Sequence, residues 1–209
     1  MAVSCRRVVR LPEPSAVAQL EPPLQLSATA IGQAGTAAGK SFGLDIYITG
    51  ITSDQQVQEY AATLRSKGQD RLVNALEKAG DVGRVAPVGS VGSSFRIVRI
   101  HPQKDGVAHI IMATNRPMSF GELYQGTRSR DYPIGIVTLD LDKDGNGTGL
   151  LHGACKVKFN KKGELEVEHF GQKPFRLANL RRQKYLIPAS APALSANRRW
   201  PYGRIPRSR

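Results

Sequence analysis

The sequence predicts a single α+β domain over residues 41–186: an antiparallel β-meander, curled into a sandwich or an open barrel, with one helical pair packed on a face. Short segments in which apolar and polar residues alternate fill most of the chain after residue 82. One helical pattern, interrupted once, precedes them. With 209 residues and 40% hydrophobic content, the chain can bury one core of ordinary size, and it has no apolar run of the roughly 18 residues that a membrane-spanning helix needs.

A strand and the helical pair are predicted first. Residues 42–48 alternate in the manner of a half-buried strand and lead to a turn at Gly50. Ser53 and Gln56 then have the spacing of a capping box, which marks the start of a helix. Apolar residues follow at helical spacing, at Val57, Tyr60, Ala61 and Leu64. A second short helix is expected before Gly80, with Leu72, Leu76 and Ala79 on one face.

The rest of the domain is predicted as strands joined by turns. Strands are expected over residues 83–92, 95–100, 107–113, 137–141 and 174–181. Turn residues at 103–106 join the second and third of these strands, and the polar residues 115–131 form a long loop before the fourth. Over residues 137–142, Val and Leu alternate with Thr and Asp, which indicates one buried face and one solvated face.

The hairpin over residues 154–170 has the best determined register. Its turn lies at residues 161–163, where Gly163 can take a positive φ. The register pairs Phe159 with Leu165, Lys158 with Glu166, Val157 with Val167, Lys156 with Glu168, and Cys155 with His169. The two pairs of opposite charges support this register. Cys155 and His169 could form a nucleophile and a base, but apolar surroundings favour an inert core thiol.

The segments on either side of the domain are expected to be disordered. Residues 1–40 are rich in Ala, Pro, Gln, Gly and Ser without a period, which is typical of a mobile leader. Ala28-Thr29-Ala30 resembles the cleavage site of an export signal, although the apolar stretch of such a signal is missing. Residues 187–209 form an Arg/Pro-rich tail with five arginines and no acid, so a large share of the net charge of +13 belongs to this tail.

Residues 34–41 match a relaxed phosphate-loop pattern, which is the basis for an alternative function as an enzyme. A phosphate loop must open a helix, because the helix N-terminus faces the phosphates. Here Ser41 opens a predicted strand instead. The sequence therefore argues against nucleotide hydrolysis, and no catalytic residue and no cofactor is predicted.

Four residues that follow one another at alternate positions could supply oxygen ligands: Asp140, Asp142, Asp144 and Asn146. Asp142, Asp144 and Asn146 have the spacing of the first half of a calcium loop, but Gly153 stands where such a loop needs a bidentate glutamate. A polar hairpin turn is the favoured interpretation, and a surface calcium site is the alternative.

The cluster that most suggests a function lies in the long loop and directly after it: Arg116, Arg128, Arg130, Asp131 and Tyr132. Loops carry binding residues more often than strands do, and arginines can hold a carboxylate or a phosphate of a ligand. In the structural alternative, Arg130 and Asp131 only hold the loop against the edge of the sheet.

Four blocks of sequence carry a resemblance to a known family: Gly-Arg-Val-Ala-Pro-Val-Gly at 83–89, Asn-Arg-Pro at 115–117, Ser-Arg-Asp-Tyr-Pro at 129–133, and Lys-Pro-Phe-Arg-Leu at 173–177. Over about residues 44–184, the chain resembles a bacterial family of uncharacterised proteins. The resemblance implies an N-terminal export signal and a periplasmic or secreted location. It brings no catalytic residues.

We therefore expect a non-enzymatic, exported module that binds a ligand or a protein partner through the arginine loop and the adjacent rim of the sheet. Nucleic acid or another polyanion is the alternative partner. It would bind the tail arginines, with Trp200 and Tyr202 available for stacking. These arginines are Arg198, Arg199, Arg204, Arg207 and Arg209.

Overall fold

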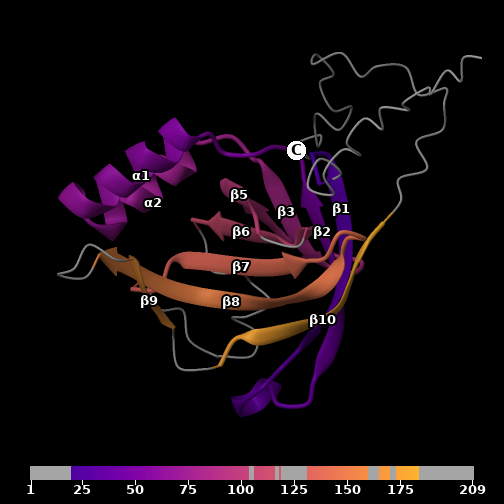
Figure 1. The fold of residues 1–209 in the computed structure, drawn as a ribbon. Helices are drawn as coiled ribbons and strands as arrows, with labels where there is room; N and C mark the ends of the chain where they lie inside the picture. Colours follow the sequence, from indigo (N-terminus) through magenta and orange to yellow (C-terminus); the bar gives the residue numbers. More distant parts are fainter. Residues whose placement is uncertain are drawn as a thin grey trace, which may run out of the picture.

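The structure is a computed structural model that describes residues 20–103, 106–115, 118, 131–159, 165–169 and 173–183. It contains a ten-stranded antiparallel sheet and two helices (Figure 1). The elements are β1 (Leu24–Ile31), the 3-10 turn η2 (Gly35–Ala37), β2 (Ser41–Ile48), α1 (Asp54–Lys67), α2 (Gln69–Glu77), β3 (Gly83–Pro87), β4 (Ser93–Phe95), β5 (Ile97–Pro102), β6 (Ala108–Thr114), β7 (Ile134–Leu141), β8 (Asn146–Phe159), β9 (Leu165–His169) and β10 (Phe175–Arg182). The predicted α+β fold with an antiparallel meander is confirmed.

The sheet is nearly barrel-shaped. Its strands lie in the order β4-β3-β2-β1-β10-β8-β7-β6-β5, and β9 pairs with β8 outside this path. β4 and β5 stand at the two ends of the order, yet only Arg96 separates them along the chain. The Arg96 N–H donates to the Ala113 carbonyl of β6 at 3.0 Å. The two ends of the sheet therefore lie next to each other.

One core fills the inside of this barrel. In β1, the buried residues Leu24, Leu26, Ala28 and Ala30 alternate with partly exposed ones. The same alternation in β2, β6 and β7 directs Leu, Ile and Met side chains inward. Burial of this apolar surface is the main favourable contribution to folding.

A second, smaller core lies outside the barrel, under the helical pair. Leu64 of α1 and Leu72 and Leu76 of α2 pack there. Their partners on β7 and β8 are Ile134, Cys155 and Val157. The helices thus cover part of the outer face of the sheet, as the sequence predicts (Figure 1).

Residues 20–40 are not the disordered leader that the sequence predicts. β1 lies between β2 and β10 and pairs with both, so the expected domain start at Ser41 is wrong. Ala28 and Ala30, which resemble an export cleavage site in the sequence, are buried in the barrel. Cleavage after Ala30 would remove most of a central strand. Residues 1–19 and 187–209 lie outside the described residues.

Two local predictions are confirmed in detail. The Oγ of Ser53 accepts the Gln56 N–H and the Oε1 of Gln56 accepts the Ser53 N–H, which completes the capping box of α1. β8 and β9 pair in the predicted register at every position from Cys155 to Phe159.

Neither described helix is long and apolar enough to cross a membrane.

Candidate functional site

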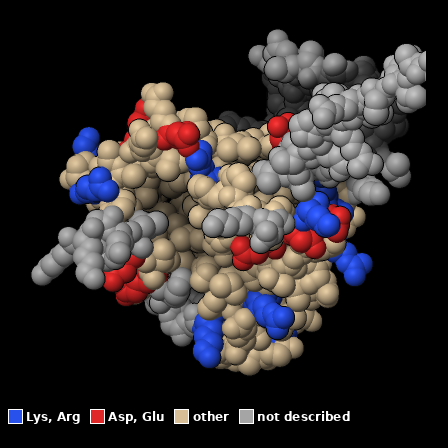
Figure 2. Space-filling view, viewed as in Figure 1, with Lys and Arg blue, Asp and Glu red and all other residues tan. Residues whose placement is uncertain are grey.

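A cavity of about 330 Å³ lies between the helical pair and the outer face of the sheet. We call it the apolar groove. Its roof consists of Val57, Tyr60, Ala61, Leu64, Leu72 and Leu76. Its floor consists of Ile97, Ile111, Ala113, Ile134, Ile136, Val157 and Phe159, and Arg99 and His101 lie at one end. The surface of the molecule is hollowed below the helices (Figure 2).

Strand pairing explains why the floor is apolar. Ile97 of β5 lies opposite Ala113 of β6, and Ala113 lies opposite Ile136 of β7, so these three side chains form one row across the outer face. Arg99 and Ile111 form the next row. Since alternate residues of a strand face opposite sides, the residues between them fill the barrel.

β8 contributes to this floor because a β-bulge changes which of its residues face the barrel and which face the helices. Leu151 lies opposite Val137 and belongs to the barrel core, whereas Cys155 lies opposite Ile134 and belongs to the core under the helices. The pairing shifts between Ile136 and Ile134, where β8 has one residue more than β7. From Cys155 onward, the odd-numbered residues therefore face the helices instead of the barrel.

Gln69, the first residue of α2, ties the roof of the groove to its floor. Its Oε1 accepts the N–H of Val157 at 2.8 Å, and its Nε2 donates to the carbonyl of Asp131 at 3.1 Å. The Val157 N–H lies beyond the last pair of β7 with β8. The amide of Gln69 thus takes the place of a neighbouring strand at this point and fixes the start of α2 over β8.

The end of the groove at Arg99 and His101 is polar. Arg99 forms an ion pair with Asp54 and donates to the carbonyl of Thr52 at 2.7 Å, which joins β5 to the start of α1. In the next row, His101 lies opposite His109 and His109 lies opposite Asp140. The Nδ1 of His109 and the Oδ1 of Asp140 are 2.6 Å apart.

Sequence reasoning missed this row of two imidazoles and one carboxylate. The turn predicted at residues 103–106 is the signal for its first half, because a hairpin at that position sets His101 opposite His109. The second half has no such signal. β6 ends at Thr114 and β7 begins at Ile134, and no short turn joins them, so the sequence does not define which residue of β7 faces His109.

Phe159 of the groove floor contacts a charged side chain of α1: the guanidinium of Arg65 lies 4.5 Å from the centre of the Phe159 ring.

A second contact lies on the other face of this part of the sheet. Glu168 of β9, which is opposite Lys156, accepts a hydrogen bond of 2.6 Å from the hydroxyl of Tyr132. This bond lowers the pKa of Glu168 and raises the pKa of Tyr132. Because the pKa of Glu168 is lowered on folding, the contact stabilises the protein above the pKa of an unfolded glutamate, and this stabilisation is lost as the pH falls through the folded value.

Of the predicted arginine-loop cluster, the structure describes Asp131 and Tyr132. Both are engaged in the fold, Asp131 through its carbonyl to Gln69 and Tyr132 through its hydroxyl to Glu168. These contacts fit the structural alternative for this end of the loop. Arg116, Arg128 and Arg130 lie outside the described residues, as do the five tail arginines, so binding through them stays a prediction.

Two of the four residues predicted as alternative calcium ligands, Asp140 and Asp142, have other partners. Asp142 accepts the backbone N–H groups of Asp144 and Asn146, each at 2.9 Å, and Asp140 contacts His109. Gly145 has a φ of 79°, which completes a tight turn between β7 and β8. The predicted hairpin turn is therefore present between β7 and β8. Among the described residues, no group of three or more His, Cys, Asp or Glu could hold a metal.

The phosphate-loop pattern of residues 34–41 joins two antiparallel neighbours, β1 and β2. The Gly32 N–H donates to the Lys40 carbonyl and the Gly39 N–H donates to the Gly32 carbonyl, which closes a hairpin loop. No helix follows Lys40, so the loop lacks the helix N-terminus that phosphate binding requires.

Cys155 is fully buried, and burial raises the pKa of its thiol to about 12. We expect no alkylation of Cys155 by iodoacetamide at pH 8 in the folded protein, because only the thiolate reacts, and complete alkylation in concentrated urea. Peptide mass mapping distinguishes Cys155 from Cys5. Rapid labelling of Cys155 in the folded protein would contradict its place in the core under the helices.

Comparison of the chain with protein-family models, with curated proteins and with solved structures found no match.

Proposed function

We propose that the protein is a binding module for a small molecule with an apolar chain, and that this chain lies in the apolar groove. The observation that carries the proposal is a cavity of about 330 Å³ whose roof and floor are almost entirely apolar. Small-molecule sites typically have volumes of roughly 300–1,000 Å³, apolar walls and a few polar groups.

The chemistry of the walls disfavours water as the occupant. A volume of about 330 Å³ corresponds to roughly ten water molecules at about 30 Å³ each. The side chains that line the roof and floor offer these waters almost no hydrogen bonds. An apolar ligand that displaces such poorly bonded waters gains affinity.

The polar end gives such a ligand a direction. Arg99 and His101 are the two basic side chains that line the groove, and both lie at the same end. A ligand with one polar group would place that group there and its chain between Ile111, Ile136 and Leu64.

This proposal keeps the class of function expected from the sequence, a ligand-binding module, and moves the site from the arginine loop to the groove. The non-enzymatic and exported character of the module rests on the resemblance and on the lack of a catalytic motif in the sequence. Polyanion binding by the tail arginines stays the alternative.

Filling the groove tests the proposal. Ala61→Phe puts a ring into the roof, whereas Ala62→Phe puts the same ring on the exposed side of α1. We expect a fluorescent anilinonaphthalene sulfonate to bind the wild type and Ala62→Phe, to be displaced by decanoate, and to bind Ala61→Phe at least about tenfold more weakly. Decanoate should raise the Tm of the first two proteins only.

Two results would contradict the proposal. If Ala61→Phe folds and binds the fluorophore and decanoate as the wild type does, the ligand does not lie in the groove. If the wild type binds neither compound, the groove is not a site for apolar chains.

A further inference from the structure

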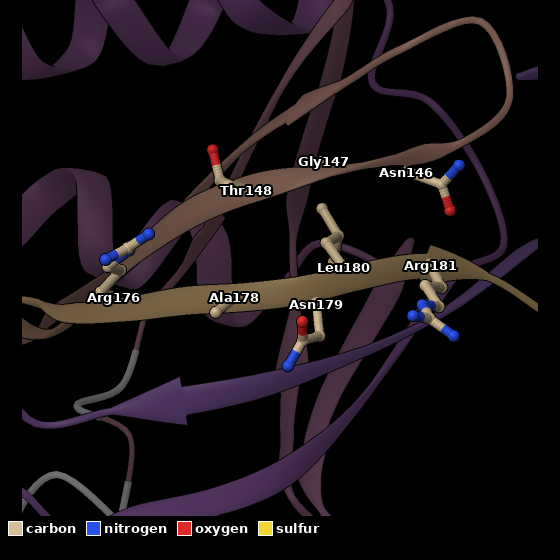
Figure 3. Close-up of a pocket in the computed structure, with 8 residues that line it drawn as sticks. All are labelled: Asn146, Gly147, Thr148, Arg176, Ala178, Asn179, Leu180 and Arg181. Carbon is tan, nitrogen blue, oxygen red and sulfur yellow. The ribbon is translucent and has the colours of Figure 1, made fainter.

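A second hollow, separate from the apolar groove, lies on the sheet over β8 and β10 (Figure 3). It has a volume of about 570 Å³ and a wide opening to solvent. Its polar side chains are Asn146 and Thr148 of β8 and Arg176, Asn179 and Arg181 of β10. Figure 3 shows Arg176 and Arg181 at opposite ends of the hollow, with Ala178 and Asn179 between them.

A β-bulge puts the two arginines on one face of the sheet. In a regular strand, residues five positions apart point to opposite faces. In β10, the pairing with β8 shifts between Leu177 and Leu180, and the pairing with β1 shifts at the same place. The extra residue lets Leu177 and Leu180 both enter the barrel core, while Arg176 and Arg181 both face outward and are exposed.

The bulge has a conformational cost at Asn179. Its φ of 52° is the one positive φ of a non-glycine residue in the described part of the chain. Asparagine takes this left-handed conformation more readily than most residues, but still less favourably than glycine. Strain of this kind tends to occur where it positions functional side chains.

The hollow is positively charged, and no acidic side chain in its lining balances this charge. No Asp or Glu lines it, and neither Arg176 nor Arg181 has an acidic partner among the described residues. Asp140 lies opposite Thr148 on the next strand, but it contacts His109. Two guanidinium forks, with the amide of Asn179 between them and the amide of Asn146 beside Arg181, fit oxyanions, which guanidinium binds with paired hydrogen bonds.

We propose that this hollow binds an extended ligand with at least two oxyanion groups, one held by Arg176 and one by Arg181, with the amide of Asn179 between the two arginines and the amide of Asn146 beside Arg181. The two Cα atoms are about 15 Å apart along the strand, which favours a ligand with separated charges over a single small anion. Phosphate and carboxylate groups share this chemistry.

The test is titration calorimetry of the full chain at low salt with inorganic tripolyphosphate, hexaglutamate and inorganic monophosphate. We expect one of the first two probes to bind and monophosphate to bind at least about tenfold more weakly. Arg176→Gln and Arg181→Gln should each weaken binding of that probe about tenfold or more. Arg71→Gln removes the same charge from the exposed face of α2 and should change the affinity less than about twofold.

Binding of tripolyphosphate would identify the groups as phosphates, and binding of hexaglutamate would identify them as carboxylates. Equal losses in Arg71→Gln and in the two hollow variants would show that net charge alone attracts the probe, which contradicts the site. Unchanged binding in Arg176→Gln and Arg181→Gln, or no binding of either extended probe, would overturn it as well. None of these results depends on the apolar groove.

Discussion

Leu26→Asp is expected to unfold the protein or to lower its free energy of unfolding by more than about 4 kcal/mol. Leu26 is completely buried at the centre of the barrel, in β1, between Ile46 of β2 and the end of β10. A carboxylate there would lose its hydration among the Leu, Ile and Ala side chains of the barrel core, and Arg182, which is paired with this position at the end of β10, is itself exposed to solvent. Since single domains are stable by about 5–15 kcal/mol, such a loss removes much or all of the stability.

Gln25→Asp is the matched control, because the neighbouring side chain is only partly buried and lies on the other face of β1. It should cost less than about 1 kcal/mol in urea unfolding followed by circular dichroism. The comparison separates the two descriptions of residues 20–40. In a disordered leader, both substitutions would be harmless, so a wild-type unfolding midpoint for Leu26→Asp would contradict the position of β1.

Gly147→Ala should destabilise the protein by about 3 kcal/mol. A Cβ atom at Gly147 would lie 1.8 Å from the carbonyl oxygen of Asp140 and 3.1 Å from the Cα of Leu141. Both atoms belong to the backbone of β7, which cannot move away without breaking its pairing with β8. β10 restrains Gly147 from the other side, where it lies opposite Leu180.

Gly80→Ala is the control for this prediction, since a Cβ atom at Gly80 would have no atom within 4 Å. Urea unfolding curves of the two variants should differ in midpoint and not in slope. Equal midpoints would mean that β7 and β8 are not paired in the register described. The residues assigned to the floor of the groove would then be wrong as well.

Those parts of the fold that depend on residues close together along the chain could be predicted from the sequence. The capping box of α1 involves Ser53 and Gln56, and the β8–β9 register follows from one short turn with charge pairs on its outer face. In both cases the interacting groups lie close along the chain, so the pattern contains the information.

β1 could not be recognised, because its inward positions include Ala28 and Ala30 and its outward positions Ser27 and Thr29. Small residues give a weak alternation, and the strand is stabilised by β2 and by β10, whose residues 176–182 are distant in sequence. The burial of alanines in a tight barrel is a property of the assembled sheet and not of the segment.

The two candidate sites escaped prediction for a related reason: each depends on a β-bulge. Without the bulge in β8, Val157 and Phe159 would be assigned to the barrel face, and without the bulge in β10, Arg176 and Arg181 would be assigned to opposite faces. A period of two, counted along the sequence, changes phase at a bulge, and neither bulge contains a distinctive sequence signal. The groove further requires α1 and α2 to lie over strands that follow them by 20 residues or more.

The central claim, that the groove under the helices takes an apolar chain, is tested most directly by isoleucine methyl NMR during titration with decanoate. Ile110 and Ile111 are adjacent in β6, but Ile110 faces the barrel interior and Ile111 faces the groove. We predict saturable shifts for the methyl groups of Ile111, Ile134 and Ile136, with contacts to the decanoate chain, and unchanged signals for Ile46, Ile48 and Ile110. Shifts confined to the interior set, or no saturable shift in either set, would contradict the claim.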